Sequence, residues 1–437
     1  MAQEKSTPLR NALSRLFPAA MLRRLARQTG MVRRLRKVDP VKLFWVLVLE
    51  LGSRGERNFA DLRRAYEKTT GTKIAASSFY NRFTPAFTRF LRELFSLGLE
   101  KLDRCSKRME GMLGQIREIL CVDSTIVRLH DALAACWPAC RTNHTQAAVK
   151  LHTVLNVRGR GPQTVKITSE RVHDGPVLRA GQWVKGRLLL FDLGYFRYSL
   201  FAAIARHGGF FLTRLKDNAN PTLLRLHRRH RGQAISVEGF GLREIRSRLR
   251  RAVLDAEAEI RFLKRSYAGR RRSTTMRVRI VGLWDESHSM YHWYITNLPV
   301  EISAEDIGKL YAARWTIELM FRELKSCYNL ESIPSRKSHV VEAFLYASLL
   351  TLIASRALLF AFRRWGALEL GERNTPLERW ARLFVSAAPD LLALVLDAAA
   401  MARTREGRLL QFFLAEAPDP NVKRRPLPER AGLKWAA

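Results

Sequence analysis

The sequence predicts an α/β fold with helical regions at both ends and a β-rich insertion. Three observations support this prediction. Apolar residues recur at helical spacing up to about residue 112, β-branched segments begin near residue 118, and basic segments of alternating polarity occupy residues 220–300. The chain has 437 residues, 47% of them hydrophobic, which is enough for two or three domains with a sizeable core.

The N-terminal region, residues 1–112, is expected to be helical. An apolar helix is predicted from Pro40 to Gly52, and Asn58 can cap the helix that follows it. The turn at Thr70–Gly71 then leads into a further helical stretch. Helix, turn and helix suit either a DNA-binding helix-turn-helix or an ordinary helical hairpin, because the turn has no specific signature.

Five segments between residues 118 and 215 have the composition of strands. Two of them flank Gly159 and Gly161, as a hairpin requires. Another is a continuous apolar run that ends at Asp192, which is typical of a central strand covered on both faces. The predicted strands are EILCVDSTIVRL, VKLHTVLNV, QTVKITSERV, RLLLFDLG and FFLTRL, and YFRYSLFAAIARHG between the last two is a predicted helix.

The C-terminal third is predicted to be helical. Ser303 caps a helix with acidic residues in its first turn, and we expect this helix to run through YAARWTIELMFRELK, residues 311–325. The later run AFLYASLLTLIASRALLFAF is long enough to span a bilayer, but Arg356 interrupts it. We therefore expect a buried helix and no membrane partner.

The excess of positive charge indicates a polyanionic partner. The formal net charge is +36, from 76 Lys and Arg against 40 Asp and Glu. The basic residues run throughout the chain and are not confined to a tail. A nucleic acid therefore explains them better than a merely solvated basic surface.

The cysteines indicate a reducing compartment. There are five, an odd number without the spacing of a disulfide framework, and no apolar signal segment opens the chain. Cys136, Cys140 and His144 are spaced four apart, but a structural zinc site usually needs four ligands and no fourth lies nearby in the sequence. We therefore expect a cytoplasmic protein without structural zinc.

Three carboxylates stand out by their positions. Asp123 lies inside one predicted strand, Asp192 ends another, and Glu318 lies on the helix after the insertion. A charge in an apolar strand is costly to bury unless something pairs with it. Hard oxygen ligands favour Mg²⁺ or Mn²⁺, and two such ions about 3.5–4 Å apart can cleave a phosphodiester. The alternative is that the aspartates lie at strand ends in solvent.

Glu318 shares its helical face with basic and phenolic groups. On a continuous helix, five side chains fall within an arc of roughly 80°. The alternative is a solvated face in which Arg314 and Arg322 form ion pairs with Glu318, each adding about 0.2–0.5 kcal/mol. The members of this face are Tyr311, Arg314, Glu318, Arg322 and Lys325.

The spacing Tyr311-x2-Arg314-x3-Glu318-x6-Lys325 resembles the Y-R-E-K signature of bacterial insertion-sequence DDE transposases, the family named after insertion sequence 4. VDSTIVRL and FDLGYF are similar to the two aspartate-bearing strands of that family, and FFLTRLKDN and ITNLP are similar to further blocks. The resemblance covers roughly residues 115–365. The first 110 residues match far less specifically.

The resemblance implies an RNase H-like (retroviral integrase-like) catalytic core interrupted by a β-domain. Its expected divisions are a helical, DNA-binding region over 1–112, the first part of the core over 113–219, the β-rich insertion over 220–300, the rest of the core over 301–365, and a helical C-terminal region with a basic tail over 366–437.

The resemblance also implies the roles of individual residues. Asp123, Asp192 and Glu318 are the expected catalytic ligands of two Mg²⁺ ions, for which Mn²⁺ can substitute. The DNA-binding candidates are Tyr311, Arg314 and Lys325 from the signature, Arg322 from the same helical face, Arg214 and Lys216 from FFLTRLKDN, and Trp293 from the insertion. Trp284 is a second candidate for stacking on a flipped base, and core packing is the alternative for both tryptophans.

The activity implied is cut-and-paste transposition by a homodimer on double-stranded DNA, in the bacterial cytoplasm and associated with the nucleoid. Water activated by metal ions cleaves one strand at the transposon end, and the freed 3′-OH attacks the opposite strand or the target, with hairpin ends as one route. The rival hypotheses are a decayed DNA-binding protein that has lost catalysis and a nuclease of the same fold that joins no ends.

The remaining acids and histidines are expected to be structural or on the surface. They lie in polar or turn-like settings, and no paired Ser or Cys suggests a triad with either histidine. These residues are Asp131, Asp174, Asp285, Glu323, His130 and His152.

Overall fold

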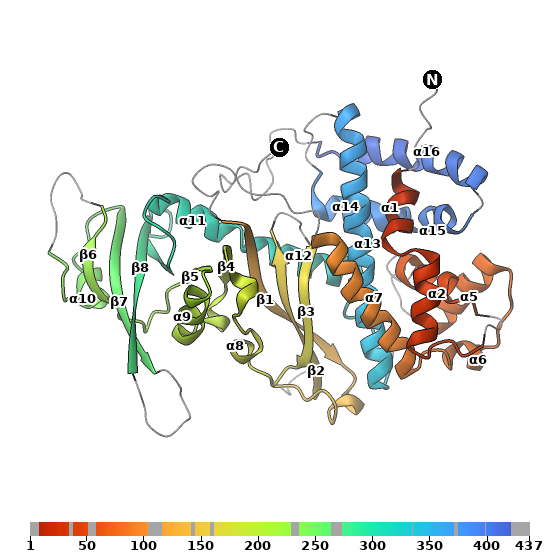
Figure 1. The fold of residues 1–437 in the computed structure, drawn as a ribbon, viewed down its shortest axis with the longest axis horizontal. Coiled ribbons are helices and arrows are strands. Elements are labelled where there is room, and N and C mark those ends of the chain that lie inside the picture. The colour runs from red at the N-terminus through yellow and green to blue at the C-terminus, as the bar shows by residue number, and fades with distance from the viewer. Residues whose placement is uncertain are drawn as a thin grey trace.

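The computed structural model has a central sheet with a β-rich end on one side and a helical lobe on the other (Figure 1). In Figure 1, strands β6 to β8 form the left end, and the N-terminal and C-terminal helices lie together at the right. The structure describes residues 8–34, 38–50, 58–103, 116–140, 145–157, 161–228, 236–263, 273–333, 335–370, 375–397 and 399–420.

Nine strands form one sheet in the order β3-β2-β1-β4-β5-β9-β8-β7-β6. Strands β1 to β3 form an antiparallel meander, while β4 and β5 run parallel to β1. The strands are β1 Glu118–Leu129, β2 Ala147–Asn156, β3 Gly161–Ser169, β4 Arg187–Phe191, β5 Phe210–Arg214, β6 Thr222–Leu226, β7 Val253–Leu263, β8 Ser273–Asp285 and β9 Met290–Thr296.

The β-rich insertion continues the sheet of the core. Strand β9 pairs antiparallel with β5, with Thr213 opposite Ile295, and β8, β7 and β6 follow outward. Strands β6 to β9 all lie within residues 220–300, the segment predicted to be β-rich. Its attachment through β5 and β9 could not be predicted, because strand pairing between distant segments leaves no local signal in the sequence.

The central strand β4 is buried on both faces, as predicted. Leu188 and Leu190 pack in the core shared with the helical lobe, while Leu189 and Phe191 face a second core on the other side. The second core includes apolar residues of α9 Tyr198–Arg206 and α10 Leu242–Arg246. It also includes Leu178, which directly follows the short helix α8 Asp174–Val177.

The helical lobe combines the N-terminal helices with the C-terminal helices. Asn58 caps α5 as predicted, by accepting a hydrogen bond from the N–H of Asp61, and Gly71 ends that helix with a φ of 69°. The helices are α1 Pro8–Leu16, α2 Ala19–Gln28, α3 Pro40–Trp45 with a π-helical turn Val46–Glu50, α5 Phe59–Thr70, α6 Ala76–Tyr80, α7 Pro85–Asp103, α13 Ser338–Leu370, α14 Leu377–Ser386, α15 Ala388–Leu396 and α16 Ala399–Glu416. The predicted end at Gly52 lies outside the described residues.

The prediction of one helix from Ser303 through residue 325 is wrong. Two helices occur, α11 Ala304–Ala312 and α12 Trp315–Ser326. Between them the N–H groups of Ala313 and Arg314 bond three residues back, to the carbonyls of Leu310 and Tyr311, as in the tighter 3₁₀ turn. Neither Gly nor Pro marks this break, so the sequence has no signal for it. Tyr311 therefore lies on a different helix from Glu318.

Helix α13 is the long apolar helix predicted to be buried. Within the described residues it is the one helix long and apolar enough to cross a membrane, and 89% of its most apolar window is buried inside the protein. Arg356 in its middle is fully buried and forms a bidentate ion pair with Glu323 of α12. The pair joins α13 to the helix that carries Glu318.

Candidate active site

The sheet brings two of the three predicted carboxylates side by side. Strands β1 and β4 are adjacent and parallel, and Val122 lies opposite Phe191. The residues that follow are Asp123 and Asp192. Asp123 faces the same side of β1 as Cys121, whose thiol donates to the carbonyl of Ala313 at the α11–α12 junction.

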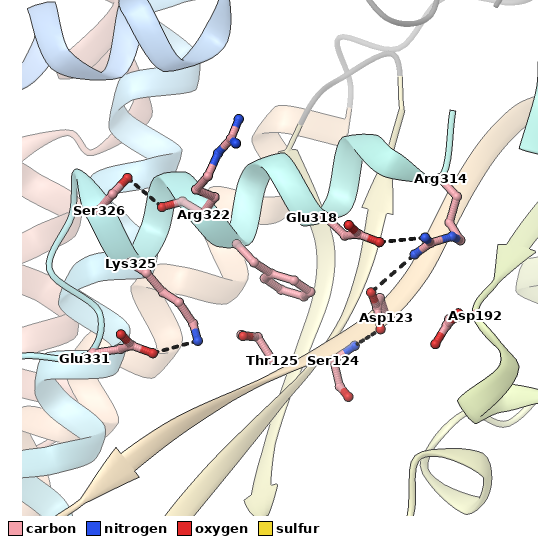
Figure 2. A pocket seen from close by; sticks show the side chains of 11 residues that line it. Asp123, Ser124, Thr125, Asp192, Arg314, Glu318, Arg322, Lys325, Ser326 and Glu331 are labelled. Carbon is pink, nitrogen blue, oxygen red and sulfur yellow. Dashed lines mark hydrogen bonds and ion pairs between the residues drawn. The ribbon is translucent and has the colours of Figure 1, made fainter. Parts of the chain in front are cut away.

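Helix α12 adds the third carboxylate. It passes over β1, and in the view of Figure 2 Glu318 lies above the two aspartates. A pocket of about 610 Å³ contains all three acids and the basic side chains of the predicted stripe. Its lining is Asp123, Ser124, Thr125, Asp192, Arg314, Glu318, Phe321, Arg322, Lys325, Ser326 and Glu331.

Arg314 lies between the carboxylates of two different elements. One guanidinium nitrogen bonds to a Glu318 carboxylate oxygen at 2.6 Å, and another lies 3.7 Å from Asp123 Oδ2. Figure 2 shows the guanidinium between these two acids. The arginine is the Ncap residue of α12, so the break between α11 and α12 directs it into the pocket. A positive charge here offsets part of the negative charge of the site.

The pKa of Asp123 indicates that the negative charges of the site are only partly balanced by positive charge. Burial, together with the charges of Asp192 and Glu318, raises the pKa of Asp123 to about 6. Two interactions oppose this shift, the 2.7 Å hydrogen bond from the Ser124 N–H and the charge of Arg314. A cation bound among the carboxylates would favour the ionised form of Asp123.

The donor set fits a hard divalent cation. Asp123, Asp192 and Glu318 offer carboxylate oxygens in one solvent-accessible pocket, the ligand type that Mg²⁺ and Mn²⁺ prefer. Among the described residues, no three acidic, His or Cys side chains already converge in the arrangement of a metal site.

The other members of the predicted stripe have distinct environments. Tyr311 is buried and its hydroxyl donates to the carbonyl of Phe191, the residue before Asp192. Lys325 lines the far end of the pocket and bonds to Glu331 at 2.6 Å and to the Ile126 carbonyl at 3.1 Å. Phosphate contact by Tyr311 would therefore require exposure of its hydroxyl, whereas Lys325 already faces the pocket.

Arg322 does not pair with Glu318. It lines the pocket, and its guanidinium lies 3.3 Å from Glu378 of α14, with 58% of its side chain exposed. The i,i+4 partner of Glu318 is Arg314. Two ion pairs were considered for this face, Arg314–Glu318 and Glu318–Arg322. The structure contains Arg314–Glu318.

The candidates from β5 and the insertion lie beyond the pocket. Arg214 is exposed and contacts His292, while the ammonium of Lys216 lies 5.2 Å above the ring of Phe196. Trp293 is buried beneath the guanidinium of Arg246, which lies 4.9 Å from its ring centroid. Trp284 is 40% exposed, so core packing applies to Trp293 and not to Trp284.

Two other predictions have structural outcomes. Cys136 and Cys140 are exposed free thiols, and His144 lies outside the described residues. Ser124 and His152 lie near each other, but the Ser124 hydroxyl donates its hydrogen bond to Asp174 and not to His152. The two residues therefore lack the serine-to-histidine hydrogen bond of a nucleophilic triad.

Sequence reasoning did not single out Trp315. It precedes Glu318 by three positions on α12 and is 49% exposed, which is unusual for a tryptophan. Its spacing from Glu318 and Arg322 places it along the same helical face. That i, i+3, i+7 spacing was visible in the sequence, but only the exposure distinguishes this residue from a core tryptophan.

The sequence matches a known domain and is similar to several known proteins. Residues 114–354 match the transposase DDE domain. The transposase for insertion sequence element IS231F of Bacillus thuringiensis subsp. israelensis is 22% identical over 83% of this chain and 82% of its own length. The putative transposase y4zB of Sinorhizobium fredii is 27% identical over 59% of this chain and 64% of its own.

A solved structure of a piggyBac transposase synaptic complex with hairpin DNA matches 96% of this chain and 87% of its own, with 10% identity and a TM-score of 0.46. The domain match covers more than half of this chain. The family expected from the Y-R-E-K spacing is therefore confirmed, and the chain belongs to the DDE transposases of bacterial insertion sequences.

Proposed function

We propose that this transposase binds the ends of its insertion sequence and cuts and joins DNA strands at the pocket of Asp123, Asp192 and Glu318. The observation that carries the proposal is that Asp123 of β1, Asp192 directly after β4 and Glu318 of α12 line one open pocket within the matched domain. The order β3-β2-β1-β4-β5, antiparallel and then parallel, supports an RNase H-like core.

The three carboxylates would hold two Mg²⁺ or Mn²⁺ ions. When bound, the ions supply a polarised water and stabilise the leaving oxygen of the phosphodiester. Arg314 balances the carboxylates in the free protein, and its guanidinium becomes available to a DNA phosphate once cations take that role. Lys325 offers a second positive charge at the other end of the pocket.

A groove in the helical lobe supports a further DNA contact in the N-terminal region. It has a volume of about 700 Å³ and lies between the end of α2 and the start of α7. Four arginines line it, and no carboxylate occurs among its described lining residues. They are Arg33, Arg34, Arg82 and Arg89. Such a surface suits the phosphates of duplex DNA, in the lobe where the sequence predicts DNA binding.

Cutting two ends together requires two active sites, so we propose a homodimer on DNA. A bacterial enzyme with this substrate acts in the cytoplasm, at the nucleoid. The freed 3′-OH would attack either the opposite strand, which gives a hairpin end, or the target. The products of cleavage distinguish these two routes.

A strand-transfer assay tests the proposal. The substrate is a DNA fragment that carries the inverted repeats flanking the coding region, with Mg²⁺ and a target plasmid. We expect nicked ends followed by joined products. End binding without nicking under any divalent ion would indicate a non-catalytic DNA-binding protein, and cleavage without joining would indicate a nuclease. Glu318→Gln should bind the ends without nicking them. Glu305→Gln is its matched control, because Glu305 lies on α11 and pairs with Arg228 outside the pocket.

A further inference from the structure

A second polar cluster lies on the opposite face of the sheet from α12. Ser124 follows Asp123 on β1, so its side chain points to the other face, where it donates to an Asp174 carboxylate oxygen at 2.8 Å. His152, opposite Ser124 on β2, lies 3.2 Å from the same oxygen. The same imidazole is 3.3 Å from the hydroxyl of Tyr195 and 2.9 Å from that of Thr168.

The cluster is buried and charged. His152 and Tyr195 are nearly inaccessible to solvent, and Asp174 is about one-quarter exposed. Burial by itself would raise the pKa of the Asp174 carboxyl. The bonds from His152 and Ser124, with the charge of Lys150 at 3.5 Å, outweigh that effect and lower the pKa. These contacts therefore favour the ionised form of Asp174.

Both catalytic aspartates are attached to this cluster through the backbone. The N–H of Ser124 donates to the carboxylate of Asp123 at 2.7 Å. Tyr195 ends the 3₁₀ turn Leu193–Tyr195 that follows Asp192, and its N–H donates to the carbonyl of Asp192 at 3.0 Å. Asp174 thus reaches the Asp123 segment through Ser124 and the Asp192 segment through His152 and Tyr195.

We propose that Asp174 is a positioning residue that sets the separation of Asp123 and Asp192 by joining Ser124 to the His152–Tyr195 pair. The inference rests on the proposed metal-dependent function. Mg²⁺ demands near-ideal octahedral geometry, so a small displacement of either aspartate weakens its binding. Residues that orient metal ligands typically change metal affinity or activity by about 10–100-fold when they are mutated.

The experiment compares Asp174→Asn, Ser124→Ala and the double variant in the full chain. We expect Asp174→Asn to raise the Mg²⁺ concentration for half-maximal nicking by about 10–100-fold. Mn²⁺ tolerates distorted sites better than Mg²⁺ and should recover part of the loss. Direct Mn²⁺ binding to the DNA-free protein should weaken in parallel, while end binding in Ca²⁺ and the thermal midpoint stay near the wild-type values.

Asp131→Asn is the matched control, because Asp131 lies in the β1–β2 connection and bonds to the N–H of Gln146 outside the pocket. If Asp174 acts through Ser124, the double variant should resemble Asp174→Asn alone. Unchanged metal dependence, additive effects of the two substitutions, or equal losses with both ions accompanied by a lower thermal midpoint would each overturn the inference. A wild-type protein that nicks with no divalent ion refutes the proposed function instead, and the Mn²⁺-binding comparison still decides the role of Asp174.

Discussion

Helix α12 carries two glutamates that pair with arginines in opposite environments. Glu323 and Arg356 are almost completely buried, at 2% and 0% exposure, and form a two-point contact between α12 and α13. Glu318 and Arg314 lie in an open pocket, with 31% of the Glu318 side chain exposed, and the same arginine also approaches Asp123. The two glutamates are five residues apart, so they point to different sides of one helix.

Burial decides whether such an ion pair fixes a helix in place or can exchange its arginine for another cation. A sealed pair with both oxygens bonded has no access to solvent ions and would leave a bare charge if it were broken. A partly exposed pair, in which Arg314 is 14% and Glu318 31% exposed, can exchange its arginine for another cation at lower cost, since solvent screens the separated charges. The buried pair fixes α12 in place, and the open pair presents Glu318 to the two aspartates.

The largest expected effect concerns the open pair. Glu318→Gln keeps the shape of the side chain but removes the charge needed to hold a divalent ion, so the rate of end nicking should fall at least about a thousand-fold, which corresponds to about 4 kcal/mol of transition-state stabilisation. End binding and the free energy of unfolding should change little. Single-turnover nicking and electrophoretic binding assays measure both quantities. A variant that nicks normally would remove Glu318 from the site.

The buried pair should respond in the opposite way. Arg356→Met leaves the Glu323 carboxylate buried without its partner, which should reduce the free energy of unfolding by about 3–5 kcal/mol. Chemical denaturation measures the loss, and Arg364→Met on an exposed part of the same helix is the control. Adding Glu323→Leu should restore most of the stability, because two apolar side chains can replace a buried ion pair. A stable single variant would mean that the pair contributes little to the contact between the helices.

The sequence singled out the three carboxylates of the pocket but not the function of the buried pair. Asp123, Asp192 and Glu318 were predictable because each occupies an unusual place, within or after an apolar strand or at a motif spacing. Glu323 was assigned to a surface or structural role, and Arg356 was noted only as an interruption of an apolar run. Whether a charged side chain is sealed depends on the packing of α12 against α13, which no local pattern encodes.

Other differences between prediction and structure have the same origin. Strands β1, β4 and β5 were predictable from composition, whereas the pairing of β5 with β9 is a contact between distant segments. No Gly or Pro marks the break between α11 and α12, and helix propensity alone would continue the helix. The Asp174 cluster joins five separate elements, so its members resembled isolated polar residues along the sequence.

A smaller effect is expected for Lys325, which offers positive charge from the open side of α12. Lys325→Ala should weaken end binding and reduce the slope of log affinity against log salt concentration by about one, if the ammonium leaves Glu331 to neutralise one phosphate. Filter binding over a series of salt concentrations measures the slope. Lys309→Ala, an exposed lysine on α11 that pairs with Asp306, is the control. An unchanged slope would remove Lys325 from the DNA-binding face.

The smallest effect is expected for Arg322. Its substitution tests whether Arg314 or Arg322 orients Glu318. Its contact with Glu378 is largely exposed, so Arg322→Ala should cost at most about 1 kcal/mol, or about fivefold in affinity for DNA ends. The nicking rate of the bound complex should stay the same, because Arg314 is the side chain that holds Glu318. Glu378→Ala provides the matching change, since it frees Arg322 for phosphate and should not weaken end binding. If Arg322→Ala abolished nicking and left binding intact, Arg322 would be the residue that orients Glu318, and the contrast between an exchangeable and a fastened pair would no longer describe α12.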